Sequence, residues 1–244
     1  MTGRTILAVV AVAMLLTVQA MADTIFSDTF TLNTTNRTAG TVLNGLTTEV
    51  GGLTWKGTDK LGGNSSDGYA SSAGTNNAWG SVVLAAAPTD TVTLTTVISG
   101  VDGTTNWFSI GMGNQATNRI SDASQKVWLL VHKGYTMLFT PSTTDVNPSG
   151  AGITTAGNHT IQFIYDPTAL TVTITIDGAT PTAFNAVSIS GWQPSNSTVV
   201  GFGNNGTQDT LHVTDFSMTM VPEPATLALL GVGGLAMLRR RSRG

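Results

Sequence analysis

The chain has 244 residues and a net charge of −3, and it contains no cysteine, which excludes disulfides, thiol chemistry and thiolate metal sites. Residues 23–221 hold 13 acidic and 6 basic residues, and this negative balance argues against nucleic acid and anionic lipid as partners. Threonine (42 residues) and glycine (28 residues) are abundant, which favours strands and turns over helices.

The N-terminus carries the three parts of a secretory signal peptide. Arg4 precedes an apolar stretch over residues 6–16, and the small residues Ala20 and Ala22 stand two apart. This pattern predicts that residues 1–22 are a signal peptide, which begins with a short apolar helix and is cleaved before Asp23. A retained membrane anchor is the alternative, but the apolar stretch is short for a membrane span.

Apolar residues alternate with polar ones through most of residues 23–220, as they do in half-buried strands. In the segment 91–98, for example, Val92, Leu94 and Ile98 share one face. The predicted strands are 24–30, 53–56, 91–98, 107–112, 126–132, 135–139, 159–165, 170–176, 199–202 and 211–220. The alternation changes parity within the last strand, which predicts a β-bulge near Asp215.

This pattern predicts an all-β fold, an antiparallel β-sandwich of jelly-roll type formed by one domain over residues 23–220. No segment of that range has the pattern of a long amphipathic helix. The length exceeds that of an immunoglobulin-type sandwich and suits a jelly roll.

The C-terminus has three consecutive parts. Val221, Pro222, Glu223 and Pro224 come first, and the uncharged run 225–238 follows. An arginine cluster ends the chain: Arg239, Arg240, Arg241 and Arg243. As a helix the run would be about 21 Å long, which is short for a hydrocarbon core of about 30 Å, and snorkelling arginine side chains would help it to span. The positive charges predict a cytoplasmic C-terminus and an external body.

These C-terminal residues resemble the PEP-CTERM sorting signal of exported bacterial proteins. The resemblance rests on Pro222, Glu223 and Pro224, the hydrophobic run and the arginine cluster, and it covers about a tenth of the chain. It implies recognition by an exosortase, a membrane-embedded transpeptidase that removes the tail. It also implies an association with extracellular polysaccharide production, as in a biofilm.

Residues 23–220 are similar to concanavalin A-like and laminin-G-like sandwiches. The similarity rests on patterns in four segments: 27–30, 159–163, 171–178 and 214–218. It implies a fold in which the first and last strands lie side by side.

No arrangement of residues in the sequence predicts catalysis. Glycoside hydrolysis needs two carboxylates across the scissile bond, but Glu49 is the only glutamate between residues 23 and 221. His132, His159 and His212 are dispersed, without a nucleophile elbow or zinc-ligand spacing. A carbohydrate-active enzyme of the sandwich type is nevertheless the alternative to a protein without catalytic activity.

Two tryptophans are candidates for carbohydrate binding. Trp79 and Trp192 lie in polar, glycine-marked segments, where an exposed ring could stack on a sugar. Trp107 and Trp128 lie within predicted strands and are expected in the core.

Asparagine and aspartate in loops offer oxygen ligands for a structural calcium ion, the one cofactor considered. The candidate pairs are Asp102 with Asn106 and Asn64 with Asp67. Ordinary turn chemistry accounts for these residues better than calcium binding does, because asparagine, aspartate and glycine favour turns in any case.

Two threonine ladders raise a remote alternative, binding to ice or another flat surface. They are Thr91, Thr93 and Thr95, and Thr171, Thr173 and Thr175. Threonine is also a common solvent-facing residue of strands, and a twisted sheet would not keep the rows flat.

Taken together, the sequence predicts an exported surface or extracellular-matrix protein that is structural or associates with polysaccharide. The tail would hold it in the inner membrane until an exosortase-type enzyme acts. The product would then reach the cell surface or the matrix.

Overall fold

The computed structural model describes residues 22–32, 37–64, 67–72, 78–101, 106–114, 125–141, 146, 152–195, 197–205 and 211–221. The side chains of Asn64, Asp67 and Gln125 are not described. Residues 1–21 and 222–244, and with them the two predicted terminal helices, lie outside the described residues. Within the described residues, no helix has the length and apolar character needed to cross a membrane.

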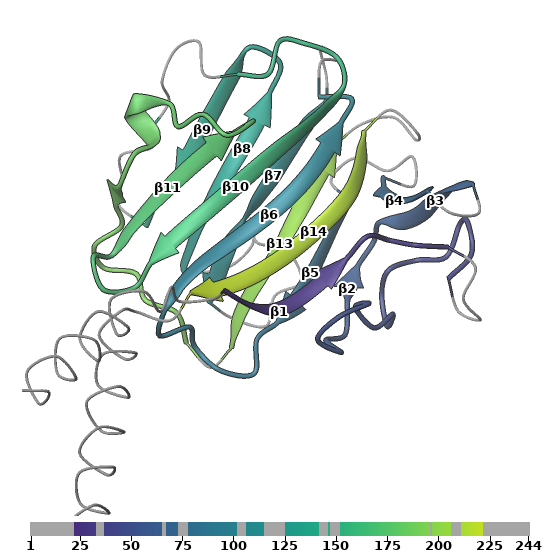
Figure 1. The fold of residues 1–244 in the computed structure, drawn as a ribbon, viewed down its shortest axis with the longest axis horizontal. Helices are drawn as coiled ribbons and strands as arrows, with labels where there is room; N and C mark the ends of the chain where they lie inside the picture. The colour runs from purple at the N-terminus through teal and green to yellow at the C-terminus, as the bar shows by residue number, and fades with distance from the viewer. Residues whose placement is uncertain are drawn as a thin grey trace, which may run out of the picture.

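Eight strands form the first of two antiparallel sheets. They are β1 (Asp23–Asp28), β3 (Lys60–Asn64), β4 (Asp67–Ser71), β6 (Thr91–Ser99), β10 (Asn158–Asp166), β11 (Thr171–Ile176), β12 (Val187–Ser188) and β14 (His212–Val221). The strand order is β12-β11-β10-β6-β14-β4-β3, and β1 pairs with β14 beside β4 (Figure 1).

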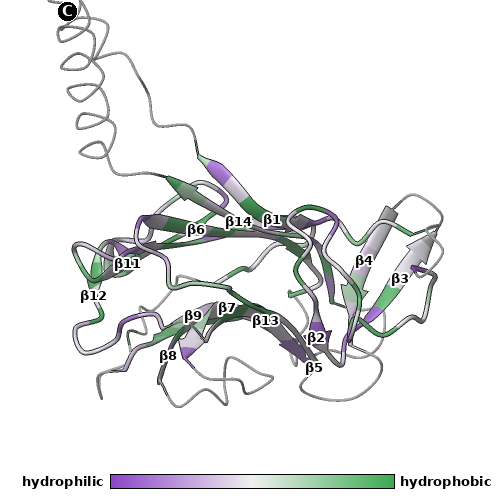
Figure 2. Cartoon of the chain, turned by 90° about the horizontal axis from the view of Figure 1, so that it is seen from below, coloured by the Kyte–Doolittle hydropathy of each residue, from purple (hydrophilic) through white to green (hydrophobic). Residues whose placement is uncertain are grey.

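Six strands form the second sheet, in the order β2-β5-β13-β7-β8-β9. Their bounds are β2 (Lys56–Gly57), β5 (Ala78–Val83), β7 (Trp107–Asn114), β8 (Gln125–His132), β9 (Tyr135–Phe139) and β13 (Thr198–Asn205). One turn of 3-10 helix, η2 (Thr182–Phe184), lies between β11 and β12. Figure 2 shows the two sheets stacked as the layers of a sandwich. The predicted all-β antiparallel sandwich is therefore confirmed.

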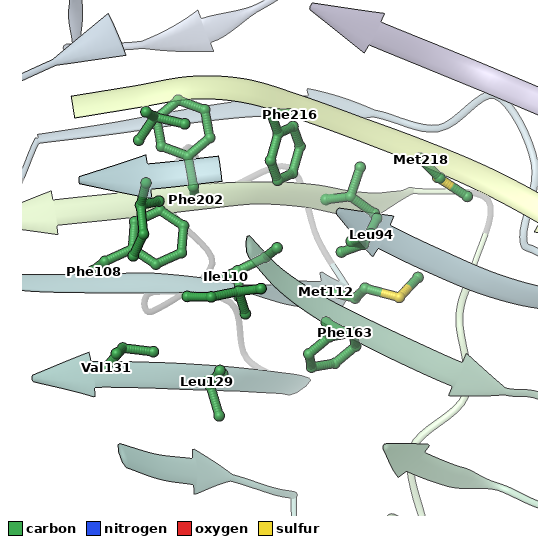
Figure 3. Packing of buried hydrophobic residues seen from close by; sticks show 14 of the residues in the cluster. Leu94, Phe108, Ile110, Met112, Leu129, Val131, Phe163, Phe202, Phe216 and Met218 are labelled. Carbon is green, nitrogen blue, oxygen red and sulfur yellow. The ribbon is translucent and has the colours of Figure 1, made fainter. Parts of the chain in front are cut away.

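The core lies between the sheets because each strand turns its apolar side inward. In β6, the residues Val92, Leu94 and Ile98 are fully buried on the inner face, whereas Thr93 and Thr95 are half-exposed on the outer face. Figure 3 shows Leu94 and Phe163 of one sheet beside Ile110 and Met112 of the other. This alternation is the period of two that the sequence displays.

The last strand is irregular where its sequence changes parity. The register of β14 against β6 shifts between Val213 and Asp215, which confirms the predicted bulge. β1 pairs with β14 from Asp23↔Met220 to Asp28↔Phe216, so the first and last strands lie side by side, as the family resemblance implied. The two ends of the described sandwich therefore leave it from neighbouring positions.

The segment between β1 and β6 was the least well predicted. The predicted strand 53–56 is only the short β2, and β3, β4 and β5 were not predicted. Glycines interrupt the alternation in this segment. In β2, a Cβ on Gly57 would lie 2.3 Å from the carbonyl oxygen of Trp79, so the close approach of β2 to β5 requires glycine.

A buried carboxylate connects β1 to the residues that follow it. Asp28 is fully buried, and the Arg37 guanidinium donates hydrogen bonds of 2.7 and 2.6 Å to its two oxygens. Trp55 Nε1 donates to Asp28 Oδ2 at 2.7 Å, and the backbone N–H of Phe30 donates to Oδ1 at 2.8 Å. These bonds satisfy a charge that would otherwise be very costly to bury.

Glu49 extends this group of charges toward the surface. Thr29 donates to it through its backbone N–H (3.0 Å) and its hydroxyl (2.6 Å), and the Thr31 N–H donates at 2.7 Å. Burial would raise the pKa of Glu49, but these hydrogen bonds outweigh it and the pKa is lowered. Arg37 Nη1 also contacts Glu49 at 3.2 Å, so one guanidinium serves two carboxylates.

We predict that Arg37→Ala destabilises the fold by about 3–5 kcal/mol, because Asp28 is then left buried without its counter-charge. Urea unfolding of the variant measures this loss. Lys133→Ala is the control, since Lys133 is exposed and its loss should change the unfolding free energy little. Equal stability of the two variants would contradict the structural role of the Asp28–Arg37 pair.

A second buried carboxyl lies at the end of β13. Asn204 Nδ2 donates to Asp59 Oδ2 at 2.6 Å, and both residues are fully buried. Asp59 Oδ1 and Asn204 Oδ1 are also buried, without a hydrogen-bond partner. Burial raises the pKa of Asp59 to about 7, although the bond from Asn204 works in the opposite direction. A proton on Asp59 removes the buried charge and supplies a donor for an oxygen that lacks one.

The raised pKa of Asp59 predicts that stability falls as pH rises from about 4 to about 7. In that window the unfolded chain has released the proton and the folded chain keeps it, so the unfolding free energy declines by up to about 1.4 kcal/mol per pH unit. Asp59→Asn should flatten this dependence and be more stable than the wild type at pH 8. Urea unfolding of the wild type and of Asp59→Asn at pH 5 and 8 measures this difference, with the exposed Asp23→Asn as control. If Asp59→Asn loses as much unfolding free energy between the two pH values as the wild type does, the raised pKa of Asp59 is refuted.

Candidate functional site

The outer face of the six-stranded sheet carries aromatic side chains along β8 and β9. In β8, the residues Val127, Leu129 and Val131 are fully buried in the core, so the residues between them point outward. The "β8–β9 strip" denotes the outward residues Trp128, Leu130 and His132 of β8 and Tyr135, Met137 and Phe139 of β9. Tyr135 is 37% exposed and the other five are half-buried.

Two ring stacks organise the strip. Trp128 and Phe139 are directly paired across the strands, and their rings lie 4.4 Å apart at an interplanar angle of 9°. His132 and Tyr135 form a second cross-strand stack, with centroids 4.7 Å apart. Cross-strand pairs of this kind stabilise a sheet and hold the rings in fixed orientations.

The strip is mostly apolar and carries little charge. Burial lowers the pKa of His132, which favours its neutral form. Trp128 Nε1 is buried without a hydrogen-bond partner. An apolar strip of this kind on a protein surface is a common mark of a binding site.

Beyond β8 the same face carries mostly small side chains. Trp128 of β8 is paired with Gly111 of β7, and Gly111 is paired with Gly201 of β13. On the side of Trp128 away from Phe139, the next two strands therefore have no side chain at this level. A Cβ on Gly111 would lie 2.3 Å from the Val127 carbonyl oxygen, so this close approach of β7 to β8 requires glycine. Trp79 lies in β5 at the far side of this face, only 9% exposed. Trp107 of β7, which is paired with His132, is half-buried on the same face and borders the β8–β9 strip.

The prediction that Trp79 and Trp192 are exposed platforms is wrong. Trp192 is fully buried and packs edge-to-face on Tyr165, with centroids 5.3 Å apart. Trp192 lies in the connection between β12 and β13, and its indole belongs to the buried core cluster. Trp79 is in a strand and also buried.

The expectation that Trp107 and Trp128 belong to the core is also wrong, since both are half-buried on the outer face. The segment 126–132 is apolar on both sides, so its composition does not show which side faces the core. The tryptophan of the central core is Trp55, which contacts the rings of Phe26, Phe30, Phe202 and Phe216.

The calcium candidates are only partly described. Asn106 is buried, and its amide donates to the carbonyl oxygen of Gly100 at 2.7 Å, as in ordinary turn chemistry. Asp102 lies outside the described residues. Asn64 and Asp67 pair at the turn between β3 and β4. Among the described residues, no group of three histidine or acidic side chains could hold a metal ion, and calcium at these loops stays a prediction.

The three histidines lie in separate environments. His132 is in the strip, and His212 stacks on Tyr69 with centroids 3.8 Å apart. His159 contacts Asp177 at 2.8 Å. Burial would raise the pKa of Asp177, but hydrogen bonds from His159 and Thr160 outweigh it and the pKa is lowered.

Glu49 and Asp28 lie close enough to Asp215 for their charges to affect its ionisation. Burial, and then the charges of Glu49 and Asp28, raise the pKa of Asp215. Asp28 and Glu49 are both engaged by Arg37 and by backbone N–H groups. Their geometry is that of a structural ion pair, which leaves neither free to act as acid or nucleophile.

The two threonine ladders do not form one surface. β10 lies between β6 and β11, so Ile164 separates Thr93 from Thr173, and Gln162 separates Thr95 from Thr175. Thr173 also accepts a hydrogen bond of 3.0 Å from the backbone N–H of Ala186. Nothing in this arrangement favours binding to ice.

Comparison with known proteins identifies the C-terminal segment. The family model described as the PEP-CTERM protein-sorting motif matches residues 221–242. This chain carries a PEP-CTERM sorting motif. Val221, its first residue, is also the last residue of β14, so the motif begins where the sandwich ends.

The fold matches solved lectins. Peanut lectin with a bound 9mer peptide is 10% identical with a TM-score of 0.50, over 74% of this chain and 96% of that chain. Lectin II from Ulex europaeus is also 10% identical at a TM-score of 0.50, over 84% of this chain and 100% of that chain. At this identity the likeness shows a lectin-like jelly-roll fold alone. No curated protein matches the chain significantly.

Proposed function

We propose that this protein is an exported, tail-sorted component of the cell surface or extracellular matrix that associates with polysaccharide and does not catalyse a reaction. The observation that carries the proposal is the sorting motif at residues 221–242. The apolar run 225–238 and the arginine cluster would hold the chain in the inner membrane, with the sandwich outside. An exosortase-type enzyme would then remove the tail.

The β8–β9 strip supports the association with polysaccharide. Sugar rings present C–H faces that pack on aromatic rings, and the Trp128–Phe139 stack holds two such rings rigidly. Tyr135 and His132 lie beyond the Leu130–Met137 pair on the same side of the strands, and they add groups that can hydrogen-bond to hydroxyls. Residues 23–221 carry an excess of acidic groups, so the ligand we propose is a neutral polysaccharide.

We expect the wild-type full chain to sediment with a neutral matrix polysaccharide, and Trp128→Ala to weaken this binding roughly tenfold. Tyr135→Ala is a second variant at a more exposed position, where the fold is less at risk. Tyr69→Ala is the matched control, because Tyr69 also stacks on a histidine but belongs to the other sheet. Equal binding by the wild type and the three variants would exclude the β8–β9 strip as the binding site. If the wild type bound no neutral matrix glycan, the proposed association with polysaccharide would be excluded.

Mass spectrometry of the protein recovered from its own cells tests the sorting. We expect a species that starts at Asp23 and lacks the C-terminal tail. A chain with Pro222→Ala and Pro224→Ala should keep its tail, because the motif is disrupted while the hydrophobic run and the arginines are unchanged. Recovery of the wild type with both ends intact would contradict the proposal.

A further inference from the structure

An apolar cavity opens at the end of the sandwich from which both termini leave. It has a volume of about 470 Å³, and none of the described residues that line it is charged. Its lining comes from β1, β14 and two connecting segments, and includes Ile25, Leu53, Leu84, Ala87, Met218 and Met220. The "tail-end pocket" denotes this cavity. Its size falls within the range of about 300–1,000 Å³ that is typical of small-molecule sites.

The position of the tail-end pocket follows from strand pairing. Met220 is paired with Asp23, so the cavity lies beside both ends of the described sandwich. Figure 1 shows β1 and β14 side by side where they reach these ends. The apolar run of the sorting motif begins at Ala225, four residues after Val221. Four residues span at most about 14 Å, so a membrane-inserted run keeps the pocket close to the hydrocarbon boundary.

The rim of the pocket is also suited to a membrane surface. Ala85 and Ala86 are exposed, and they form an uncharged loop with Ala87 and Pro88. Exposed apolar residues beside an apolar cavity are disfavoured in water and favoured at a lipid interface. Asp23 is exposed and is paired with Met220 of the pocket lining, and its charge favours zwitterionic over anionic lipid.

We propose that the tail-end pocket binds an acyl chain of a zwitterionic phospholipid while the tail is in the membrane. This inference rests on the membrane-held intermediate of the proposed function. The acyl chain would enter between the two sheets, where its CH₂ groups contact Met218, Met220 and Ile25 in place of water. The lipid would fix the orientation of the sandwich on the bilayer and so present the sorting motif at a defined height.

The absence of cysteine allows a probe to be attached at one chosen position. The full chain with Thr89→Cys, labelled with bimane at the pocket rim, is reconstituted in phosphatidylcholine vesicles, with or without bromine on the acyl chains. Flotation of the vesicles reports insertion of the tail, and bromine quenching reports lipid at the rim. Thr180→Cys is the control, since Thr180 is exposed and follows the end of β11 that points away from the tail.

We expect strong quenching at position 89, none at position 180, and a clear loss of quenching when Ala87→Phe fills the pocket. Thermal unfolding of the Ala87→Phe chain checks that it is folded. Flotation without quenching at position 89 would overturn this inference alone, and so would occupation of the pocket by a second copy of the chain, which leaves the probe insensitive to bromine. Quenching that Ala87→Phe does not change would show that the loop touches lipid without an acyl chain in the pocket. Loss of flotation would overturn the proposed function and this inference together.

Discussion

The buried carboxylate of Asp28 is the interaction on which the arrangement of this sandwich depends. It receives hydrogen bonds from Arg37, from the Trp55 indole and from the backbone of Phe30, so one side chain connects β1 with two later segments. A chain without cysteine has no covalent links between its strands, and a bidentate ion pair in the interior is the closest non-covalent substitute. Glu49 adds a second acceptor for the same guanidinium.

This anchor also fixes the aromatic centre of the core. Trp55 donates to Asp28 and packs against Phe26 and Phe216 of one sheet and Phe202 of the other. The position of β1 beside β14 follows, and with it the position of both chain ends and of the tail-end pocket. The β8–β9 strip is held differently, by cross-strand ring stacks and by the close approach of strands at Gly111.

The sequence predicts the features that depend on local periodicity. It misses those that depend on which segments, distant in the sequence, pack over a residue. Alternation predicts β6, β10, β11 and β14, and the parity change near Asp215 predicts the bulge. The exposure of a tryptophan depends instead on which strand face is inward and on which segment covers it, so Trp192 and Trp128 were assigned to the wrong environments. In β8, the β-branched residues Val127 and Val131 lie on the same face, and this was the signal that could have identified that face as the inward one. The pairing of Arg37 with Asp28 had no signal in the sequence.

The placement of β14 has a mechanical consequence for the membrane-held intermediate proposed above. β14 runs in the interior of its sheet, with β6 on one side and β1 and β4 on the other. A pull on Val221 acts along the strand, and the ladder hydrogen bonds on both sides are perpendicular to it. These bonds are loaded in shear and have to break together, whereas a peeled edge strand loses them singly. A load between Val221 and the β8–β9 strip would therefore have to break many hydrogen bonds at once.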